Sequence, residues 1–248
     1  MSEQHEIALP APATPSPAIA GGLTSAQEPT RVYGVDEAGR GPWLGPMAIA
    51  VVLVDAASVR ALEKLGVQDS KRFGSSARGK AQRAELAEQI EQCVVDYRCA
   101  LVSVDEIDRY TFRGQLNHLE RVVVARLLGD DELKADRDAR IICDGARLFS
   151  PMKREYPGLV AVDKGESAHV SVAAASVLAK HARDAAFAAI AEKYAAEFGP
   201  ITGGGYVNKA TRAFLEAYQA RHGKGVLPPE ARKSWGARKR KPEQLPLA

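Results

Sequence analysis

The feature that most constrains this chain is an unbroken run of eight apolar residues, MAIAVVLV, at positions 47–54. It is the longest such run in the sequence, and a helix that crosses a bilayer needs about 20 apolar residues. The run is therefore too short to span a membrane and is typical of a strand buried inside a sheet. We expect a fold built on a buried sheet and no contact with a membrane.

The composition is that of a soluble globular protein, with 46% apolar and 26% charged residues. A net charge of +3 does not by itself indicate a nucleic-acid partner. Three cysteines without C-x-x-C spacing argue against disulfides and a zinc site, and no basic leader precedes Arg31. We expect a cytoplasmic protein and a monomer. The basic residues do gather near the C-terminus: Arg232, Lys233, Arg238, Lys239, Arg240 and Lys241.

The chain divides into three segments that differ in composition and in apolar periodicity. Residues 1–30 contain five prolines and no apolar period, which predicts a disordered tail. Residues 31–222 have the length and patterning of one folded domain. Residues 223–248 form a basic C-terminal extension, which we interpret as a nucleic-acid clamp or an aid to solubility.

Five segments of the folded domain are predicted to be strands. The first two, 32–36 and 46–54, are expected to pair through the turn-rich GRGPWLGP. The third covers 93–104, where Cys93, Val95, Tyr97 and Cys99 recur with period two. Arg140–Asp144 and Leu159–Val162 are short apolar runs bounded by turn residues.

Helical periodicity separates these strands. Leu116, Leu119 and Val123 share one helix face, and the capping box from Ser103 to Glu106 is expected to begin that helix. The longest helix is predicted over Val170–Phe198, and its many alanines allow close packing on a sheet. Leading strands followed by strands that alternate with helices indicate an α/β fold with a mixed five-stranded sheet and a C-terminal helical extension.

Acidic residues mark the ends of two predicted strands. Asp36 and Glu37 close the first strand, and Asp144 closes RIICD. Because neighbouring side chains on a strand face opposite ways, Asp36 and Glu37 can share one site only if the strand ends or bulges at Glu37. Asp163 and Glu166 precede the long helix, where either could instead cap its N-terminus.

Carboxylates gathered in one pocket repel each other and are stable with cations between them. Oxygen ligands favour Mg²⁺ or Mn²⁺, and two such ions about 3.5 to 4 Å apart support phosphodiester hydrolysis. The sequence lacks a dinucleotide-binding fingerprint, a P-loop, a nucleophile elbow and H-E-x-x-H. Cys143 is expected to be an apolar filler that points away from the acids.

The segment GVDEAGRGPWLGPMAIA resembles the opening motif of type 2 ribonucleases H, the ribonuclease HII family. The likeness continues in DSK (69–71), ICDG (142–145), KGESAHVSVAAASVLAKHARD (164–184) and GGGY (203–206), in the family's order. The resemblance implies a ribonuclease H-like fold and two divalent ions, Mg²⁺ or Mn²⁺. It also implies cleavage of the RNA strand of RNA/DNA hybrids and of DNA duplexes at embedded ribonucleotides, in DNA replication and ribonucleotide excision repair.

Carried over by position, the resemblance makes Asp36, Glu37 and Asp144 metal-binding catalytic acids. The fourth position departs from the usual Lys-Gly-Asp, because Glu166 follows Lys164-Gly165 here; we favour Glu166, with Asp163 as the alternative. The remaining residues bind substrate by the same resemblance: Gly39, Arg40, Gly41, Lys71, Lys180 and Tyr206. A turn with two glycines also allows close approach to a ribose 2′-hydroxyl, and a buried core tyrosine is the other interpretation of Tyr206.

Three other interpretations remain. A non-catalytic hybrid-binding module would carry a degenerate site, marked by Glu166, and would never cut its ligand. A type 3 ribonuclease H fits a glutamate as the fourth acid, but the Gly-Arg-Gly turn argues against it. A nucleotide-dependent transferase would need a phosphate-cradling loop that the sequence lacks.

Overall fold

The computed structural model describes residues 31–68, 73–131, 133–136 and 138–237. The predicted tail over 1–30, the predicted substrate-binding Lys71 and the end of the basic extension lie outside these residues. Among the helices described, none has the length and hydropathy needed to cross a membrane.

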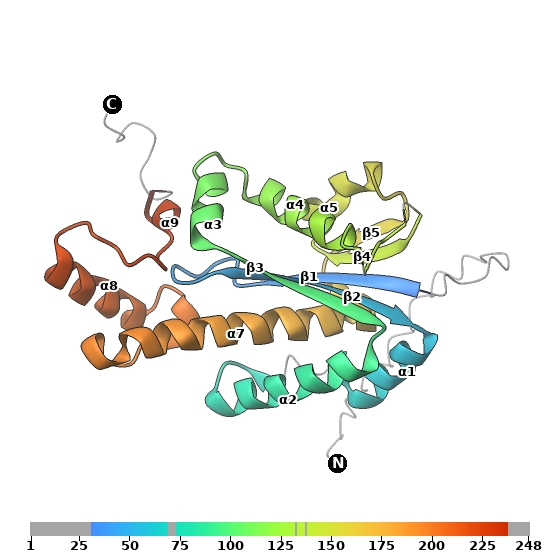
Figure 1. Cartoon of the computed structure of the whole chain (residues 1–248), viewed down its shortest axis with the longest axis horizontal. Coiled ribbons are helices and arrows are strands. Elements are labelled where there is room, and N and C mark those ends of the chain that lie inside the picture. The colour runs from blue at the N-terminus through green and yellow to red at the C-terminus, as the bar shows by residue number, and fades with distance from the viewer. Residues whose placement is uncertain (1–30, 69–72, 132, 137, 238–248) are drawn as a thin grey trace, which may run out of the picture.

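A five-stranded mixed sheet forms the centre of the fold (Figure 1). Its strands are β1 (Arg31–Ala38), β2 (Met47–Asp55), β3 (Asp96–Val102), β4 (Arg140–Asp144) and β5 (Leu159–Val162), in the order β3-β2-β1-β4-β5. β1 is antiparallel to β2 and parallel to β4, and β4 is parallel to β5. The predicted mixed sheet is confirmed, and it puts β1 at the point where strand direction changes.

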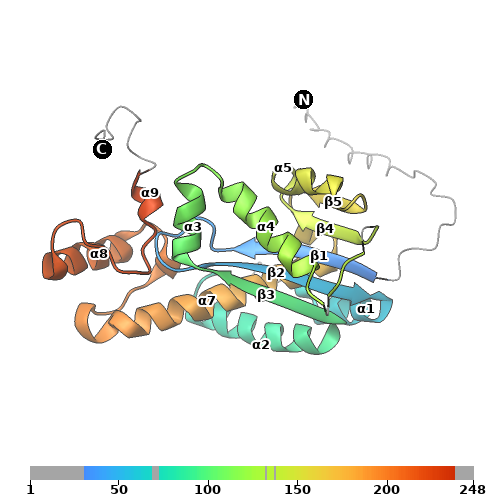
Figure 2. The same ribbon diagram turned by 45° about the horizontal axis from the view of Figure 1, so that its top comes forward.

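Helices cover both faces of the sheet (Figures 1 and 2). One face carries α3 (Val104–Thr111), α4 (Leu116–Leu128) and α5 (Ala146–Phe149); the other carries α1 (Ala56–Leu65), α2 (Ala77–Cys93) and α7 (Val170–Phe198). The short elements are η2 (Ser150–Arg154), α6 (Gly165–Ala168), η3 (Gly203–Gly205), α8 (Lys209–His222) and α9 (Lys233–Ala237).

The apolar strand β2 supplies both cores because its side chains alternate between the two faces. Met47 and Ile49 pack with the α4 side of the sheet, whereas Ala48 and Ala50 pack with α7. The small residues on the second face let α7 approach closely. A Cβ added to Gly34 of β1 would lie 2.2 Å from the carbonyl carbon of Ser171, so only glycine fits there.

Two local predictions were wrong. Cys93 ends helix α2 and β3 begins only at Asp96, so the first residues of 93–104 are not a strand. The capping box does form, with Ser103 Oγ accepting from the Glu106 N–H, but it begins α3 and not the helix that contains Leu119. A turn with Gly114 at φ +68° separates the two helices.

A smaller third core joins the C-terminal part of the chain to the sheet domain. Phe187 and Tyr194 of α7 pack with Phe214 of α8 and with Leu44 of the β1–β2 connection. Ala231 also belongs to this core and forms an isolated antiparallel bridge with Leu44. The chain after α8 therefore returns to the connection between β1 and β2.

Candidate active site

Two of the predicted metal ligands lie at the carboxyl ends of neighbouring parallel strands. β1 and β4 pair in parallel up to Val35 and Cys143, and Asp36 and Asp144 follow directly. The Gly165 N–H donates to Asp144 Oδ1 at 3.0 Å, which holds the start of α6 against the end of β4. The structure thus brings Asp36, Asp144 and the loop before α7 to one edge of the sheet.

Asp36 and Glu37 lie on opposite faces of β1. The pairing with β2 continues regularly from Asp36–Ala50 through Glu37–Ile49 and on to Ala38, so the strand neither ends nor bulges at Glu37, the condition stated above for one shared site. Asp36 faces α7 and Glu37 faces α4. β1 nevertheless ends one residue later, at Ala38, and Asp36 and Glu37 both interact electrostatically with Asp144. The two carboxylates therefore lie on either side of the strand end, and both are close enough to Asp144 to belong to one site. Cys143 is buried as expected, but on the same face as Glu37.

Burial dominates the electrostatics of Asp36. It raises the pKa of this carboxyl to about 6, and the negative charge of Asp144 acts in the same direction. A hydrogen bond with Ser176 and the positive charge of Lys180 oppose the shift. A positive charge close to Asp36 would therefore stabilise the ionised form of this carboxyl.

Glu37 is more strongly perturbed. Burial, together with the charges of Asp36 and Glu120, raises its pKa to about 8, although Arg40 lowers it. Its Oε2 atom is buried and has no hydrogen-bond partner among the described residues. Glu120 on α4 is fully buried, and burial raises its pKa to about 7. A buried carboxylate oxygen without a partner is costly, so this site is incomplete without a further partner for Glu37.

Glu166, rather than Asp163, shares its contacts with Asp36. Glu166 Oε2 lies 3.4 Å from Ser176 Oγ and 3.8 Å from Lys180 Nζ, the two groups of α7 that also act on Asp36. Asp163 Oδ1 instead accepts from the Ala146 N–H at 2.9 Å, at the start of α5. The side chain of Glu166 thus points to the acidic cluster, and that of Asp163 is occupied elsewhere.

The donor set suits hard divalent cations, because all four predicted ligands offer carboxylate oxygens. The orphaned oxygen of Glu37 and the raised pKa values of Asp36 and Glu37 are the features that a cation would relieve. In the part of the chain that the structure describes, no three such side chains are yet gathered at ligand spacing. The donor types and the unpartnered oxygen of Glu37 therefore fit a divalent cation.

The Gly-Arg-Gly turn follows the acids Asp36 and Glu37 after one residue, Ala38. It consists of Gly39, Arg40 and Gly41. Gly39 has φ +81°, a left-handed conformation that favours glycine. Arg40 Nε pairs with Glu120 at 3.1 Å, and the guanidinium also donates to Asn117. The Arg40 side chain therefore lies against α4, and the backbone of the turn is the part that is left to face a ligand.

Tyr206 stands beside this turn and is not a core residue, since 54% of its surface is exposed. The ring lies next to Gly41: a Cβ added to this glycine would lie 3.4 Å from Tyr206 Cε1. A pocket of about 210 Å³ is lined by Gly39, Lys180, Arg183 and Tyr206, among others. The structure thus brings three predicted substrate-binding residues, Gly39, Lys180 and Tyr206, to one pocket.

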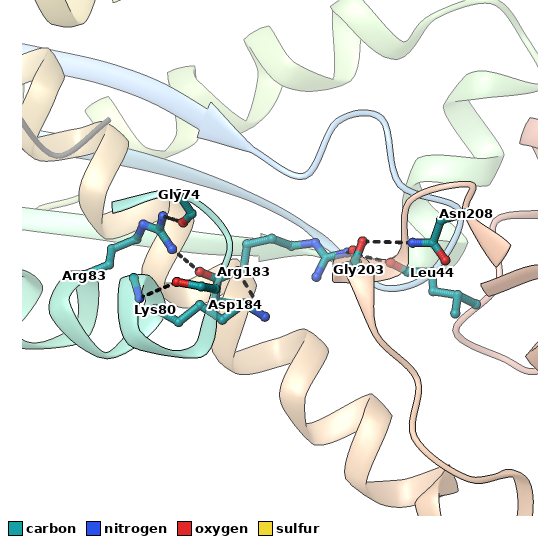
Figure 3. Close-up of polar contacts among 11 residues, drawn as sticks. Leu44, Gly74, Lys80, Arg83, Arg183, Asp184, Gly203 and Asn208 are labelled. Atoms are coloured by element: carbon teal, nitrogen blue, oxygen red, sulfur yellow. Dashed lines mark hydrogen bonds and ion pairs between the residues drawn. The ribbon is translucent and has the colours of Figure 1, made fainter. Parts of the chain in front are cut away.

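Two arginines to which the sequence assigned no role, Arg83 and Arg183, also line this pocket, and Figure 3 shows their polar contacts. Arg83 of α2 donates to Asp184 of α7 and to the Gly74 carbonyl at 2.8 Å. Arg183 extends from α7 and donates to the carbonyls of Leu44 at 2.6 Å and Gly204 at 3.0 Å. These arginines fix the loops around the pocket and make its wall basic.

Glu120 was missed as well, although the sequence carries a signal for it. It follows Leu116 by four residues and precedes Val124 by four, so it falls on the apolar face of α4. An acid on a buried helix face needs a partner, and Arg40 supplies it.

The mixed five-stranded sheet with helices on both faces defines the class of protein, one with the ribonuclease H-like fold. The structure is similar to that of ribonuclease H2 from Pyrococcus horikoshii OT3, with a TM-score of 0.69, 30% identity, and coverage of 83% of this chain and 93% of that chain. It is also similar to the Archaeoglobus fulgidus RNase HII that was solved in a PCNA:RNase HII complex, with a TM-score of 0.68, 27% identity, and coverage of 86% and 100%.

The sequence comparisons identify the family. Residues 33–237 match the family model described as Ribonuclease HII. The chain is 37% identical over 223 residues to the ribonuclease HII of Thermococcus sibiricus, which covers 87% of this chain and 92% of that relative. The chain belongs to the ribonuclease HII family, which supports ribonuclease H activity. Bst-RNase HIII, solved with Mn²⁺, shares only the fold, at 23% identity and a TM-score of 0.62.

Proposed function

We propose that this protein is a metal-dependent endonuclease that hydrolyses the RNA strand of RNA/DNA hybrids and nicks DNA duplexes on the 5′ side of embedded ribonucleotides. The observation that carries the proposal is that β1 runs directly from the acids into the Gly-Arg-Gly turn. Asp36 and Gly39 are three residues apart, and Gly39 lines the same pocket as Tyr206. The acids proposed for hydrolysis and the turn proposed for sugar recognition thus lie at the end of β1 and directly after it.

Asp36, Glu37, Asp144 and Glu166 are the proposed ligands of two Mg²⁺ or Mn²⁺ ions. When bound, such ions activate water and stabilise the leaving oxygen of a phosphodiester, which gives a 3′-hydroxyl and a 5′-phosphate. Ser176 and Lys180 hold Glu166 toward Asp36. The longer side chain of Glu166 reaches the cluster from α6, the short helix that Gly165 packs against Asp144.

Substrate selection is assigned to the Gly-Arg-Gly turn and to Tyr206. The N–H groups of a glycine-containing turn can approach a ribose and bind its 2′-hydroxyl, the group that distinguishes RNA from DNA. The exposed ring of Tyr206 offers a face on which the sugar or base next to it packs. Lys180 and Arg183 make the pocket wall attractive to the phosphate backbone.

The test is a labelled DNA duplex with one ribonucleotide, incubated with Mg²⁺ or Mn²⁺. The wild type should produce a nick on the 5′ side of the ribonucleotide, and Asp36→Asn and Glu166→Ala should each abolish it. Asp163→Ala is the matched control at the neighbouring acid and should retain activity. Loss in Asp163→Ala with activity kept in Glu166→Ala would move the fourth ligand to Asp163. Binding of the duplex without any cleavage by the wild type would contradict the proposal and favour a binding module.

A further inference from the structure

Arg232 does not behave as a member of a solvated basic cluster. Only 2% of its surface is exposed, and its guanidinium makes three hydrogen bonds to one loop. Nη2 donates to the Gly39 carbonyl at 2.6 Å, Nη1 to the Arg40 carbonyl at 2.9 Å and Nε to the Gly45 carbonyl at 3.0 Å. Each of the three nitrogens of this side chain therefore donates to the connection between β1 and β2.

The residues around Arg232 continue the same pattern. Trp235 Nε1 donates to the Gly41 carbonyl at 3.1 Å, and its ring lies 4.9 Å from the Arg232 guanidinium carbon. The Arg232 N–H donates to the Trp43 carbonyl at 2.8 Å. We call residues 230–235 the return segment, since they bring the chain back to the Gly-Arg-Gly turn from the far end of α8.

The return segment is itself anchored on the sheet domain. Asp108 of α3 accepts from the N–H groups of Lys233 at 2.8 Å and Ser234 at 3.0 Å. Glu230 accepts at 2.7 Å from both Lys193 and Tyr194 of α7. Arg232 is thus held by a segment that is fixed at both ends, and it cannot be treated as a mobile surface charge.

The three carbonyl oxygens of the Gly-Arg-Gly turn are all used in this way. Arg232 takes those of Gly39 and Arg40, and Trp235 takes that of Gly41. Among the described residues, the N–H groups of these three residues donate to no backbone carbonyl. A turn whose carbonyls are bound on one side leaves its N–H groups as donors for an incoming oxygen. Burial of a charged guanidinium costs free energy. Packing of the loop alone would not require this cost.

We propose that Arg232, supported by Trp235, is a positioning residue that sets the backbone of the Gly-Arg-Gly turn for recognition of the ribose. It binds the turn's carbonyl oxygens and so presents the turn's N–H groups to the 2′-hydroxyl. This inference rests on the proposed function.

Single-turnover nicking of the one-ribonucleotide duplex separates positioning from the alternatives. The rate constant at saturating enzyme reports the geometry of the bound complex, whereas an unfolded fraction of the enzyme raises only the apparent half-saturating enzyme concentration. The variants are Arg232→Gln, Arg232→Lys and Trp235→Phe. Lys233→Gln is the matched control, because it removes an exposed positive charge from the same segment. The thermal midpoint of each protein is measured in parallel.

We expect Arg232→Gln to lower the saturated rate constant by about tenfold to a hundredfold, the scale of a misplaced reacting group. Arg232→Lys should not restore it, since an ammonium cannot span three carbonyls. Trp235→Phe should give a smaller loss, and Lys233→Gln should raise only the half-saturating enzyme concentration.

An unchanged rate constant in Arg232→Gln, or full rescue by Arg232→Lys, would overturn the inference while leaving the proposed function intact. If Arg232→Gln does not fold, Trp235→Phe decides, because it deletes one donor at a partly exposed position; an unchanged rate constant there also overturns the inference. A wild type that never nicks would remove the proposed function and this inference together.

Discussion

Glu37→Gln should separate stability from activity in the metal-free protein. Glu37 is buried between Asp36 and Glu120, and its pKa is raised from 4.5 to about 8. The folded state therefore holds the proton more tightly than the unfolded chain does. Its contribution to stability is complete below about pH 4.5 and is lost as the pH rises through 8. Glutamine carries no charge and removes this dependence.

The size of the effect follows from the two pKa values. One pH unit corresponds to about 1.4 kcal/mol, so the full difference for Glu37 approaches 5 kcal/mol above pH 8. Burial also raises the pKa values of Asp36 and Glu120, to about 6 and about 7, so these groups titrate in the same pH range as Glu37. The effect of Glu37 alone is therefore smaller than the full difference. We expect the free energy of unfolding of Glu37→Gln, relative to the wild type, to grow by about 3 kcal/mol between pH 5 and pH 8.

The assay is urea denaturation with a chelator present, at a series of pH values from 5 to about 8.5. Mg²⁺ or Mn²⁺ added in place of the chelator should stabilise the wild type more than Glu37→Gln, because the cation binds the folded carboxylates. The variant should also lose nicking activity. A stability difference that stays constant with pH would refute the assignment of a buried, proton-holding Glu37.

Three further substitutions test the fold and the pocket. Gly34→Ala should destabilise the protein by about 3 kcal/mol, because its Cβ would meet the Ser171 backbone at 2.2 Å; an unchanged urea midpoint would contradict the close packing of α7 on β1. Leu119→Ala should cost about 2–5 kcal/mol in the same assay, since this fully buried side chain fills the α4 core. Tyr206→Ala should lower nicking by about tenfold or more at an unchanged thermal midpoint, with Tyr206→Phe close to the wild type; equal losses in both variants would assign the role to the hydroxyl instead of the ring.

The sequence was sufficient to predict those parts of the fold and site that depend on a local pattern, or on parallel strands that end at the same edge of the sheet. The alanine-rich stretch predicted the whole of α7, because no glycine or proline interrupts residues 170–198. The convergence of Asp36 and Asp144 followed from the rule that parallel strands end at one side of a sheet, and β1 and β4 are parallel.

The sequence was insufficient where contacts join distant segments. Arg40 and Glu120 are separated by most of the first half of the domain, and Arg232 lies still further from Gly39. No local period records such pairs, so a buried arginine looked like part of a basic tail. The boundary at Cys93 failed for the opposite reason: a cysteine with β-branched neighbours fits the end of a helix and the start of a strand equally well.

Helix α7 fixes the spacing between the acids and the loop beside the Gly-Arg-Gly turn. Ser176 and Lys180 lie at the acids and Arg183 lies at the loop beside the Gly-Arg-Gly turn, and all three belong to one uninterrupted helix. Ser176 and Arg183 are separated by about 10 Å along the axis at 1.5 Å per residue. Deletion of one residue between them would shorten that span and rotate Arg183 by about 100° relative to Ser176. Under the proposed function, the spacing between the phosphate that is cut and the sugar that is recognised is therefore set by the register of one helix and does not depend on the conformation of a loop.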